Sequence, residues 1–343
     1  MWQVTGQARV MDLLRRSLEK GALAHAYLFS GPPHTGKMTL ALELARALNC
    51  QSGEPPCGEC EVCRKIAEGK HADVQIIALN GGVENGEARR RTEISIEQVR
   101  QMQHSASLPP FEGKYKLFII DGAEILSLEA ANCLLKTLEE PVERVVFVLL
   151  TTNASAIPET VISRCQKLEL HPMAAGDIEE ALVAKHGVEP ERAKLLSHLC
   201  HGGIGWAIAA AENSELLERY NASRDEVLGI IKGGYGERFG YAAALAGQFG
   251  QNRQVVMQVL DLWLDVWRDI MLVKSGYAEA VNNIDIKAKL AGLAEKFSLE
   301  VIRQYIGSVQ AAEEQLRQNA SPRLVLEVMM LDMPRERKEE ARR

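Results

Sequence analysis

The sequence predicts an α/β domain built on a parallel sheet, followed by a C-terminal half that is all helical. Two observations carry this prediction. Short apolar runs alternate with segments of helical periodicity in the first half of the chain, and such runs stop after residue 177. Strands that are apolar along their whole length are typical of a parallel sheet with helices on both faces.

Five strand-like runs follow one another in the N-terminal half. They are AYLFS, DVQIIAL, KLFIID, VVFVLLTT and KLEL, at residues 26–30, 73–79, 116–121, 145–152 and 167–170. The segments between them place apolar residues at helical spacing. This alternation predicts that each strand is followed by a helix that packs on one face of the sheet.

The C-terminal half shows only helical spacing, interrupted by glycine-rich breaks such as HGG and KGGYG. The expected helices are 178–185, 190–199, 207–212, 215–232, 253–273 and 299–317. The predicted domains are an α/β P-loop-type domain at 1–170, a small helical domain at 171–212, a larger helical domain at 213–335 and a charged tail at 336–343.

Composition limits the class of protein. The chain has 343 residues, of which 46% are hydrophobic and 25% charged, with a net charge of -6. These values are ordinary for a globular protein and argue against a uniformly basic surface, so any contact with nucleic acid is expected to be local or shared with a partner. There is no N-terminal signal pattern and no apolar stretch of about 18 residues, so we expect a cytoplasmic protein.

The segment GPPHTGKMT resembles a phosphate-binding P-loop. Gly31, Gly36 and Lys37 have the spacing G-x-x-x-x-G-K, between a strand-like run and a helical segment. Met38, however, stands where a hydroxyl normally holds magnesium, and Thr39 lies one step further, about 100° around the helix. We expect a phosphate-binding ancestry with impaired metal handling; the alternative is a turn retained for folding alone.

Two later positions bear on the same chemistry. Asp121 ends an apolar run, as the magnesium-supporting aspartate of Walker B does, but Gly122 follows where many ATPases carry a glutamate. Glu124 comes three positions after Asp121, and the sequence does not place it. Asn153 ends the next run and is expected to reach the γ-phosphate. Binding of ATP and Mg²⁺ is therefore left open.

Four cysteines are clustered in a turn-forming segment. Cys50, Cys57, Cys60 and Cys63 have the spacing C-x6-C-x2-C-x2-C, which predicts a tetrahedral structural site for Zn²⁺. The rival is an iron–sulfur cluster, although the chain lacks the final cysteine and proline of the ferredoxin run; unrelated thiols are the remaining alternative. His71 is a possible substitute for one of the cysteine ligands, but we expect it to be a surface or capping residue.

Arg164 lies in a short corner between a helical segment and the last strand-like run. It either pairs with a carboxylate or projects outward to stabilise transition-state charge in another subunit, as an arginine finger in trans. The other basic residues considered for DNA contact are Lys65 and Arg89 to Arg91. The three arginines lie in the polar stretch NGGVENGEARRRTE, where a solvated loop is expected.

Taken together, four segments resemble the bacterial DNA polymerase III clamp-loader subunits of the AAA+ superfamily. They are GQARVMDLLRRSLEKGALAHAYLFSGPPHTGK, the four-cysteine insert, LFIIDGAEILSLEAANCLLKTLEEP and TTN…SRCQ. LLKTLEEP and SRC are the most specific marks. The match is firm over about the first 170 residues, and QNASPRLVLEVMML extends it more loosely.

The resemblance implies an AAA+ domain with a zinc module, a helical lid and a collar that joins a hetero-pentamer. Implied partners are the gamma/tau ATPase and delta subunits, the sliding clamp and primed DNA. Where the ATPase subunits carry a P-loop hydroxyl, a Walker B glutamate and a sensor 2 arginine, this chain has Met38, Gly122 and Trp206.

These substitutions make the chain similar to the delta-prime type. That type implies a non-catalytic subunit of the polymerase holoenzyme, with little or no ATP hydrolysis of its own. Arg164 is then implied to act in trans on the neighbouring ATPase subunit. The alternative is an active gamma/tau-type ATPase, which Lys37, Asp121 and Asn153 favour.

Overall fold

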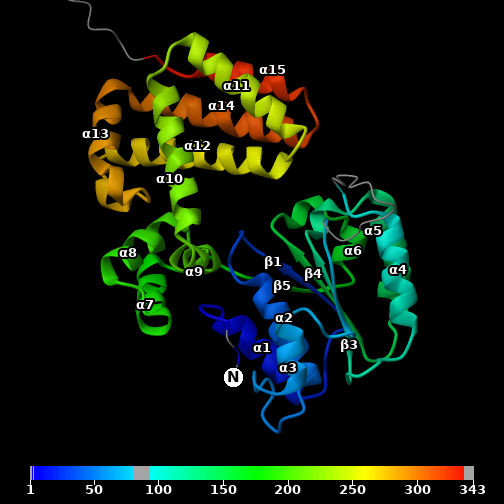
Figure 1. Cartoon of the computed structure of the whole chain (residues 1–343). Coiled ribbons are helices and arrows are strands. Elements are labelled where there is room, and N and C mark those ends of the chain that lie inside the picture. Colours follow the sequence, from blue (N-terminus) through cyan, green and yellow to red (C-terminus); the bar gives the residue numbers. More distant parts are fainter. Residues whose placement is uncertain (1, 3, 80–92, 336–343) are drawn as a thin grey trace, which may run out of the picture. The chain divides into compact units, whose positions relative to one another are not determined.

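The computed structural model describes residues 2, 4–79 and 93–335. The chain separates into two compact units: Met1–Ala181 with Gly202–Trp206, and Leu182–His201 with Ala207–Arg343 (Figure 1). The expected boundaries near residues 170, 212 and 335 are not tested by this division and stay predictions. Arg89 to Arg91 and the charged tail at 336–343 lie outside the described residues.

A five-stranded parallel sheet forms the centre of the first unit, with the strand order β2-β3-β4-β1-β5. The five predicted runs are thus confirmed as strands. Their bounds are β1 Ala26–Ser30, β2 Val74–Ile77, β3 Lys116–Asp121, β4 Val145–Thr151 and β5 Gln166–Glu169.

Helices cover both faces of this sheet, because successive strand residues alternate between two apolar cores. Tyr27 and Phe29 of β1 pack with α1, α2 and α3, whereas Leu28 packs with α4, α5 and α6. The predicted α/β class is therefore confirmed. The helices are α1 Ala8–Glu19, α2 Lys37–Asn49, α3 Glu61–Ala67, α4 Ile96–Ser107, α5 Leu128–Glu139 and α6 Glu159–Ile162, with 3-10 turns η1 Ala123–Ile125 and η2 Ala154–Ala156.

All described residues after β5 are helical or irregular, as expected for the C-terminal half. The second unit has one apolar core, in which Trp263, Trp267 and Tyr305 are almost completely buried. Its helices and the two that link it to the first unit are α7 Ala175–His186, α8 Pro190–Leu199, α9 Ile204–Glu212, α10 Ser214–Lys232, α11 Tyr235–Phe249, α12 Arg253–Lys274, α13 Lys287–Lys296, α14 Leu299–Arg317 and α15 Pro322–Asp332, with 3-10 turns η3 Ala278–Ala280 and η4 Ile284–Ile286.

A polar contact joins the end of α8 to α12 inside the second unit. His201 Nε2 lies 3.0 Å from a carboxylate oxygen of Asp265. Burial lowers the pKa of His201, but Asp265 and Asp269 raise it more, so the net shift is upward. None of the helices in the described part of the chain combines the length and the apolar run that crossing a membrane requires.

Candidate functional site

The P-loop connects the carboxyl end of β1 to the first turn of α2, as the motif predicts. Gly31 has φ 147° and Gly36 has φ 92°, values that favour glycine. A Cβ atom on Gly31 would lie 2.2 Å from the carbonyl oxygen of Leu170, just after β5. The fold itself therefore requires glycine at this position, whether or not a nucleotide binds.

Hydrogen bonds from distant segments hold the loop in place. Gln7, immediately before α1, donates from Nε2 to the carbonyl of Thr35 at 3.4 Å and to that of His171 at 2.8 Å. The amide of Gly205, in α9, donates to the carbonyl of His34 at 2.9 Å. The loop is thus a braced part of the first unit.

The Lys37 ammonium group is turned back onto its own loop. Its Nζ atom donates to the carbonyl oxygens of Gly31 at 2.8 Å and of Pro32 at 2.7 Å. Burial lowers the pKa of Lys37, and the nearby carboxylates of Glu124 and Asp121 only partly oppose this. The lysine is therefore held at the expected end of a phosphate site, where a phosphate would compete with two carbonyls for it.

The two residues after Lys37 do not share its environment. Met38 is half-buried and packs against the apolar core beneath α2. Its thioether is at most a weak acceptor and supplies no oxygen ligand for magnesium. Thr39 is exposed, and its predicted role in nucleotide binding stays a prediction.

Asp121 and Glu124 lie at the carboxyl edge of the sheet. Asp121 ends β3 and keeps much of its surface open to solvent; partial desolvation of its carboxyl group and the neighbouring Glu124 raise its pKa, whereas Lys37 opposes this. Glu124 follows Gly122, which has φ 83°. Its Oε1 atom accepts from the amide of Thr152 at 3.1 Å and from the Thr152 hydroxyl at 2.7 Å, so this carboxylate is fixed to the end of β4.

This pairing of Glu124 with Thr152 was not predicted. The two residues are 28 positions apart, and only the adjacent, parallel β3 and β4 bring them together. The Oε2 atom of Glu124 is buried and makes no hydrogen bond with the described residues. The signal available in the sequence was the polar pair Thr151-Thr152 at the end of an otherwise apolar strand.

Asn153 has a structural contact in this arrangement. It is the N-cap of η2, and its Oδ1 atom accepts from the amide of Ser155 at 3.1 Å. Its own amide donates to the hydroxyl of Thr151 at 3.0 Å. The cap accounts for an asparagine at this position, and the predicted contact with a γ-phosphate stays a prediction.

The four cysteines converge on one point, as their spacing predicts. Their sulfur atoms all lie within 4.8 Å of one another, with Cys50 to Cys60 and Cys57 to Cys63 both at 4.0 Å. Zinc–sulfur bonds of about 2.3 Å in a tetrahedron place sulfur atoms about 3.8 Å apart. The donor set and the spacing therefore fit a structural zinc ion.

Local backbone structure positions these thiols. Cys50 is the C-cap of α2 and Cys60 is the N-cap of α3. The sulfur of Cys57 accepts from the amide of Cys60 at 3.3 Å, and that of Cys60 from the amide of Cys63 at 3.5 Å. Burial opposes the effect, but the amides of Gln51 and Cys63 and the neighbouring thiols lower the pKa of Cys60 to about 6, whereas burial raises the pKa of Cys63 to about 12. Amide donors favour the thiolate form that a metal requires.

His71 lies outside the cysteine cluster in the described structure. It is buried, so the expectation of a surface histidine is wrong. The expectation of a capping role is closer, because its Nδ1 atom accepts from the amide of Asp73 at 3.1 Å. Lys65, a second residue near this module, pairs with Glu61 at 3.1 Å and with Glu112 at 3.0 Å.

Arg164 pairs with a carboxylate, which is one of the two alternatives that the sequence left open; its role as a finger in trans stays a prediction. Its Nη2 atom lies 2.5 Å from a carboxylate oxygen of Glu139, at the end of α5, and its Nη1 atom donates to the carbonyl of Thr160 at 2.8 Å. The side chain nevertheless remains 34% exposed, and that of Glu139 is 50% exposed. Exposed ion pairs stabilise a protein by about 0.2–1 kcal/mol, so Arg164 can leave Glu139 for a stronger anion at little cost in free energy.

Comparison with known proteins identifies the family. The family model described as "DNA polymerase III, delta subunit" matches residues 6–174, and that described as "DNA polymerase III, delta subunit, C terminal" matches residues 241–334. Together the two models account for well over half of the chain.

Individual relatives of the chain are also subunits of DNA polymerase III. The chain is 29% identical to DNA polymerase III subunit delta' of Bacillus subtilis, covering 95% of both proteins. It is 26% identical to subunit tau of the same organism, covering 96% of this chain and 60% of tau. Against subunit tau of Escherichia coli it is 35% identical, over 62% of this chain and 32% of tau.

Among solved structures, a gamma-subunit-related protein of DNA polymerase III from Thermotoga maritima aligns with 96% of this chain and 99% of its own length, at 18% identity and a TM-score of 0.48. That alignment adds nothing to the fold described above. The two family models and the relative that is matched over 95% of its length point to the same family. The chain belongs to the family of DNA polymerase III clamp-loader subunits.

Proposed function

We propose that this chain is a delta-prime-type subunit of the clamp loader, which helps to load the sliding clamp onto primed DNA while hydrolysing little or no ATP itself. The observation that carries the proposal is the environment of Met38. It packs against the apolar core at the position where an ATPase presents a magnesium-binding hydroxyl. Hydrolysis needs a magnesium ion between the β- and γ-phosphates. Without the hydroxyl ligand this ion is held less well, and much of the stabilisation of transition-state charge is lost.

The second half of the argument is the water-activating position. Gly122 follows Asp121 in the place of a glutamate, and the nearest carboxylate along the chain, Glu124, accepts two hydrogen bonds from Thr152. A carboxylate held in this way is directed toward the end of β4. Both metal handling and water activation are therefore weakened, while the loop itself is retained because Gly31 is needed by the fold.

Arg164 is proposed to supply the catalytic charge that its own chain does not use. Its guanidinium group is partly exposed and is held by a surface carboxylate, Glu139, and a backbone carbonyl. A phosphate and a carboxylate can each bind a guanidinium group bidentately, but a phosphate carries more charge. The phosphate of a nucleotide in a neighbouring ATPase subunit therefore binds Arg164 more strongly than the exposed carboxylate of Glu139 does. In this proposal, Glu139 keeps the finger in position before assembly.

The cysteine cluster is proposed to hold a structural Zn²⁺. Cys50, Cys57, Cys60 and Cys63 would supply four thiolates and leave no open position, so the ion would close the hairpin between α2 and α3 and take no part in a reaction. The other subunits (gamma/tau and delta) in a hetero-pentamer, the sliding clamp and primed DNA are the proposed partners, in the cytoplasm.

The second candidate is an active gamma/tau-type ATPase. The observations in its favour are the retained Lys37 and Asp121, which lie close enough to influence each other's pKa. Steady-state ATP hydrolysis by the purified chain alone separates the two candidates. The delta-prime proposal predicts no turnover above that of the Lys37→Ala variant; turnover that Lys37→Ala abolishes would establish the ATPase instead.

A further inference from the structure

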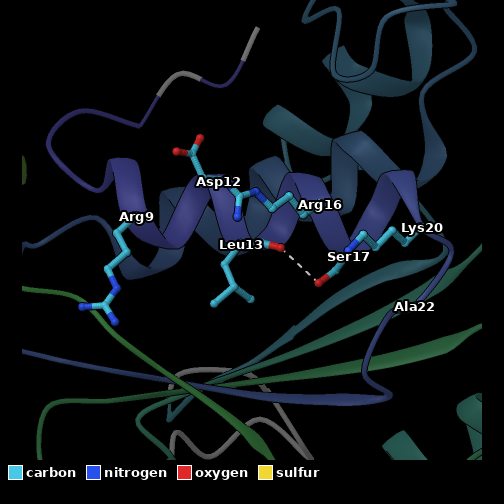
Figure 2. Close-up of a pocket in the computed structure, with 7 residues that line it drawn as sticks. All are labelled: Arg9, Asp12, Leu13, Arg16, Ser17, Lys20 and Ala22. Carbon is cyan, nitrogen blue, oxygen red and sulfur yellow. Dashed lines mark hydrogen bonds between the residues drawn. The ribbon is translucent and has the colours of Figure 1, made fainter.

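The outward face of α1 carries a basic groove that the proposed function does not use. It has a volume of about 380 Å³ and is lined by Arg9, Asp12, Leu13, Arg16, Ser17 and Lys20 (Figure 2). These positions recur at helical spacing on one side of α1. We call the three cations Arg9, Arg16 and Lys20 the α1 stripe.

The helix that carries the α1 stripe is firmly positioned. Val10 and Leu14 of α1 are buried in the core beneath the sheet. Gln7, which precedes the helix, is bonded to the P-loop and to His171. Because the opposite face is fixed in this way, the cations of the groove are presented to solvent on a rigid element.

Within the described residues, the α1 stripe lacks ion-pair partners. Arg9, Arg16 and Lys20 are all exposed and none has a carboxylate within 4 Å, whereas Asp12 lies 3.9 Å from Arg15. Surface arginines on other helices do find a carboxylate one turn away. Examples are Arg219 with Glu215, Arg303 with Glu300, and Arg323 with Glu327.

This contrast matters because the chain as a whole carries a net charge of -6. In an acidic protein, three cations on one helix face without ion-pair partners among the described residues form a local positive field, which is the electrostatic footprint of a polyanion site. Asp12 reduces the field but does not cancel it.

We infer that the α1 stripe binds phosphates of a DNA backbone. This inference rests on the proposed function, which makes DNA the object on which the assembly acts. At 1.5 Å per residue, Arg9 and Lys20 are separated by about 17 Å along the helix axis. That length corresponds to about five nucleotide steps of one DNA strand at 3.4 Å each, so the α1 stripe reaches up to three phosphates.

The chemistry of the groove favours a nucleic acid over an acidic protein. Two of the three cations are guanidinium groups, which bind phosphate oxygens bidentately. The apolar part of the lining is small, because it consists of Leu13 and the methyl group of Ala22, whereas the centre of a protein interface is enriched in aromatic and apolar groups. Backbone phosphates need no such apolar centre, and contacts of this kind position the DNA without reading its sequence.

The test is the salt dependence of DNA binding by the full chain. Fluorescence anisotropy of a labelled primed duplex is measured at several potassium chloride concentrations for the wild type and for the triple variant Arg9→Ala, Arg16→Ala, Lys20→Ala. If all three cations contact phosphates, the slope of log affinity against log salt falls by about 2.7 in the variant. A fourfold rise in salt then weakens wild-type binding about 40-fold more than it weakens the variant's binding.

A matched control removes the same charge elsewhere. The triple variant Arg219→Ala, Arg303→Ala, Arg323→Ala deletes three exposed, ion-paired arginines and is expected to leave the slope within about one of the wild-type value. Asp12→Asn is expected to tighten binding. Circular dichroism checks that each variant is folded.

Four results would overturn the inference. One is an equal loss of slope in the control variant, which would indicate a general charge effect. Another is unchanged DNA binding by the α1 variant, or no binding by the wild type even at low salt. The last is that the α1 variant loses binding to polyglutamate but keeps its binding to DNA, which would assign the groove to an acidic protein. None of these results bears on ATP hydrolysis, so the proposed function and this inference fail separately.

Discussion

The structural role of Gly31 gives the most stringent test of the idea that the P-loop is retained as part of the fold. In the Gly31→Ala variant, the new methyl group would lie 2.2 Å from the Leu170 carbonyl oxygen and 3.1 Å from its carbonyl carbon. Both are backbone atoms, so either β5 or the loop has to move. The residue would also keep φ 147°, a conformation that side chains rarely adopt.

The expected cost follows from these two effects. Backbone strain of this kind costs about 1–3 kcal/mol, and displacement of the packed strand adds to it, so we expect a loss of about 3 kcal/mol or more in the free energy of unfolding of the first unit. Gly21→Ala is the matched control. Gly21 has φ 63° but no atom within 4 Å of the added methyl group, so only the strain of about 1–2 kcal/mol remains.

Urea denaturation followed by circular dichroism measures both variants, and hydrogen exchange shows which unit opens. In the absence of nucleotide, Gly31→Ala is expected to lower the urea midpoint of unfolding clearly more than Gly21→Ala does. Protection from hydrogen exchange is expected to be lost in β1 and β5 of the Gly31→Ala variant. If the two variants unfold at the same urea concentration, or if Gly31→Ala resembles the wild type, the fold does not depend on Gly31 and its retention needs another reason.

Three further predictions concern other sites. Elemental analysis of protein purified without chelator is expected to give one zinc ion per chain and less in Cys60→Ser; absence of zinc, or an iron–sulfur absorption band, would contradict the zinc proposal. Met38→Thr is expected to leave ATP turnover by the isolated chain undetectable in a phosphate-release assay, because Gly122 is unchanged; measurable turnover would show that the missing hydroxyl was the sole defect. The pKa of His201 is raised in the folded chain by Asp265, so its stabilising contribution is present at low pH and is lost as pH rises through the folded pKa. The difference in stability between wild type and His201→Gln should therefore be larger at about pH 6 than at about pH 8.5, and a pH-independent difference in thermal unfolding would refute the ion pair.

Sequence patterns located those features that depend on neighbouring residues. The run AYLFS coincides with β1, because a strand buried on both faces has a continuous apolar signal. The four cysteines lie within 14 residues of one another, so a turn-forming segment is sufficient to bring them together.

Contacts that depend on tertiary structure were either missed or, as for the carboxylate that pairs with Arg164, expected without the partner being identified. The contact of Glu124 with Thr152 and that of Arg164 with Glu139 join residues 28 and 25 positions apart. Local periodicity contains no information on such pairs; the sheet and the packing of α5 create them. The sequence also gave no signal for the α1 stripe, because an exposed helical face with several charges is the ordinary case.

The helices at Tyr235–Phe249 and Lys287–Lys296 were absent from the expected set. The first contains Gly236, Gly240 and Gly247, which lower helix propensity by about 1 kcal/mol each. Its apolar face is instead stabilised by packing in the core of the second unit, where Tyr241 is buried. Tertiary contacts therefore override the local preference of this segment.

In the proposed function, this chain contributes an arginine to a neighbour's ATP site while its own P-loop takes no part in hydrolysis. The direct measurement is ATP turnover by the assembly reconstituted with gamma/tau and delta, using Arg164→Ala or Lys37→Ala in this chain. We expect Arg164→Ala to lower turnover at the adjacent site by about 10³-fold or more, and Lys37→Ala to leave turnover unchanged. The opposite pattern, with Lys37→Ala impaired and Arg164→Ala fully active, would contradict the proposed function.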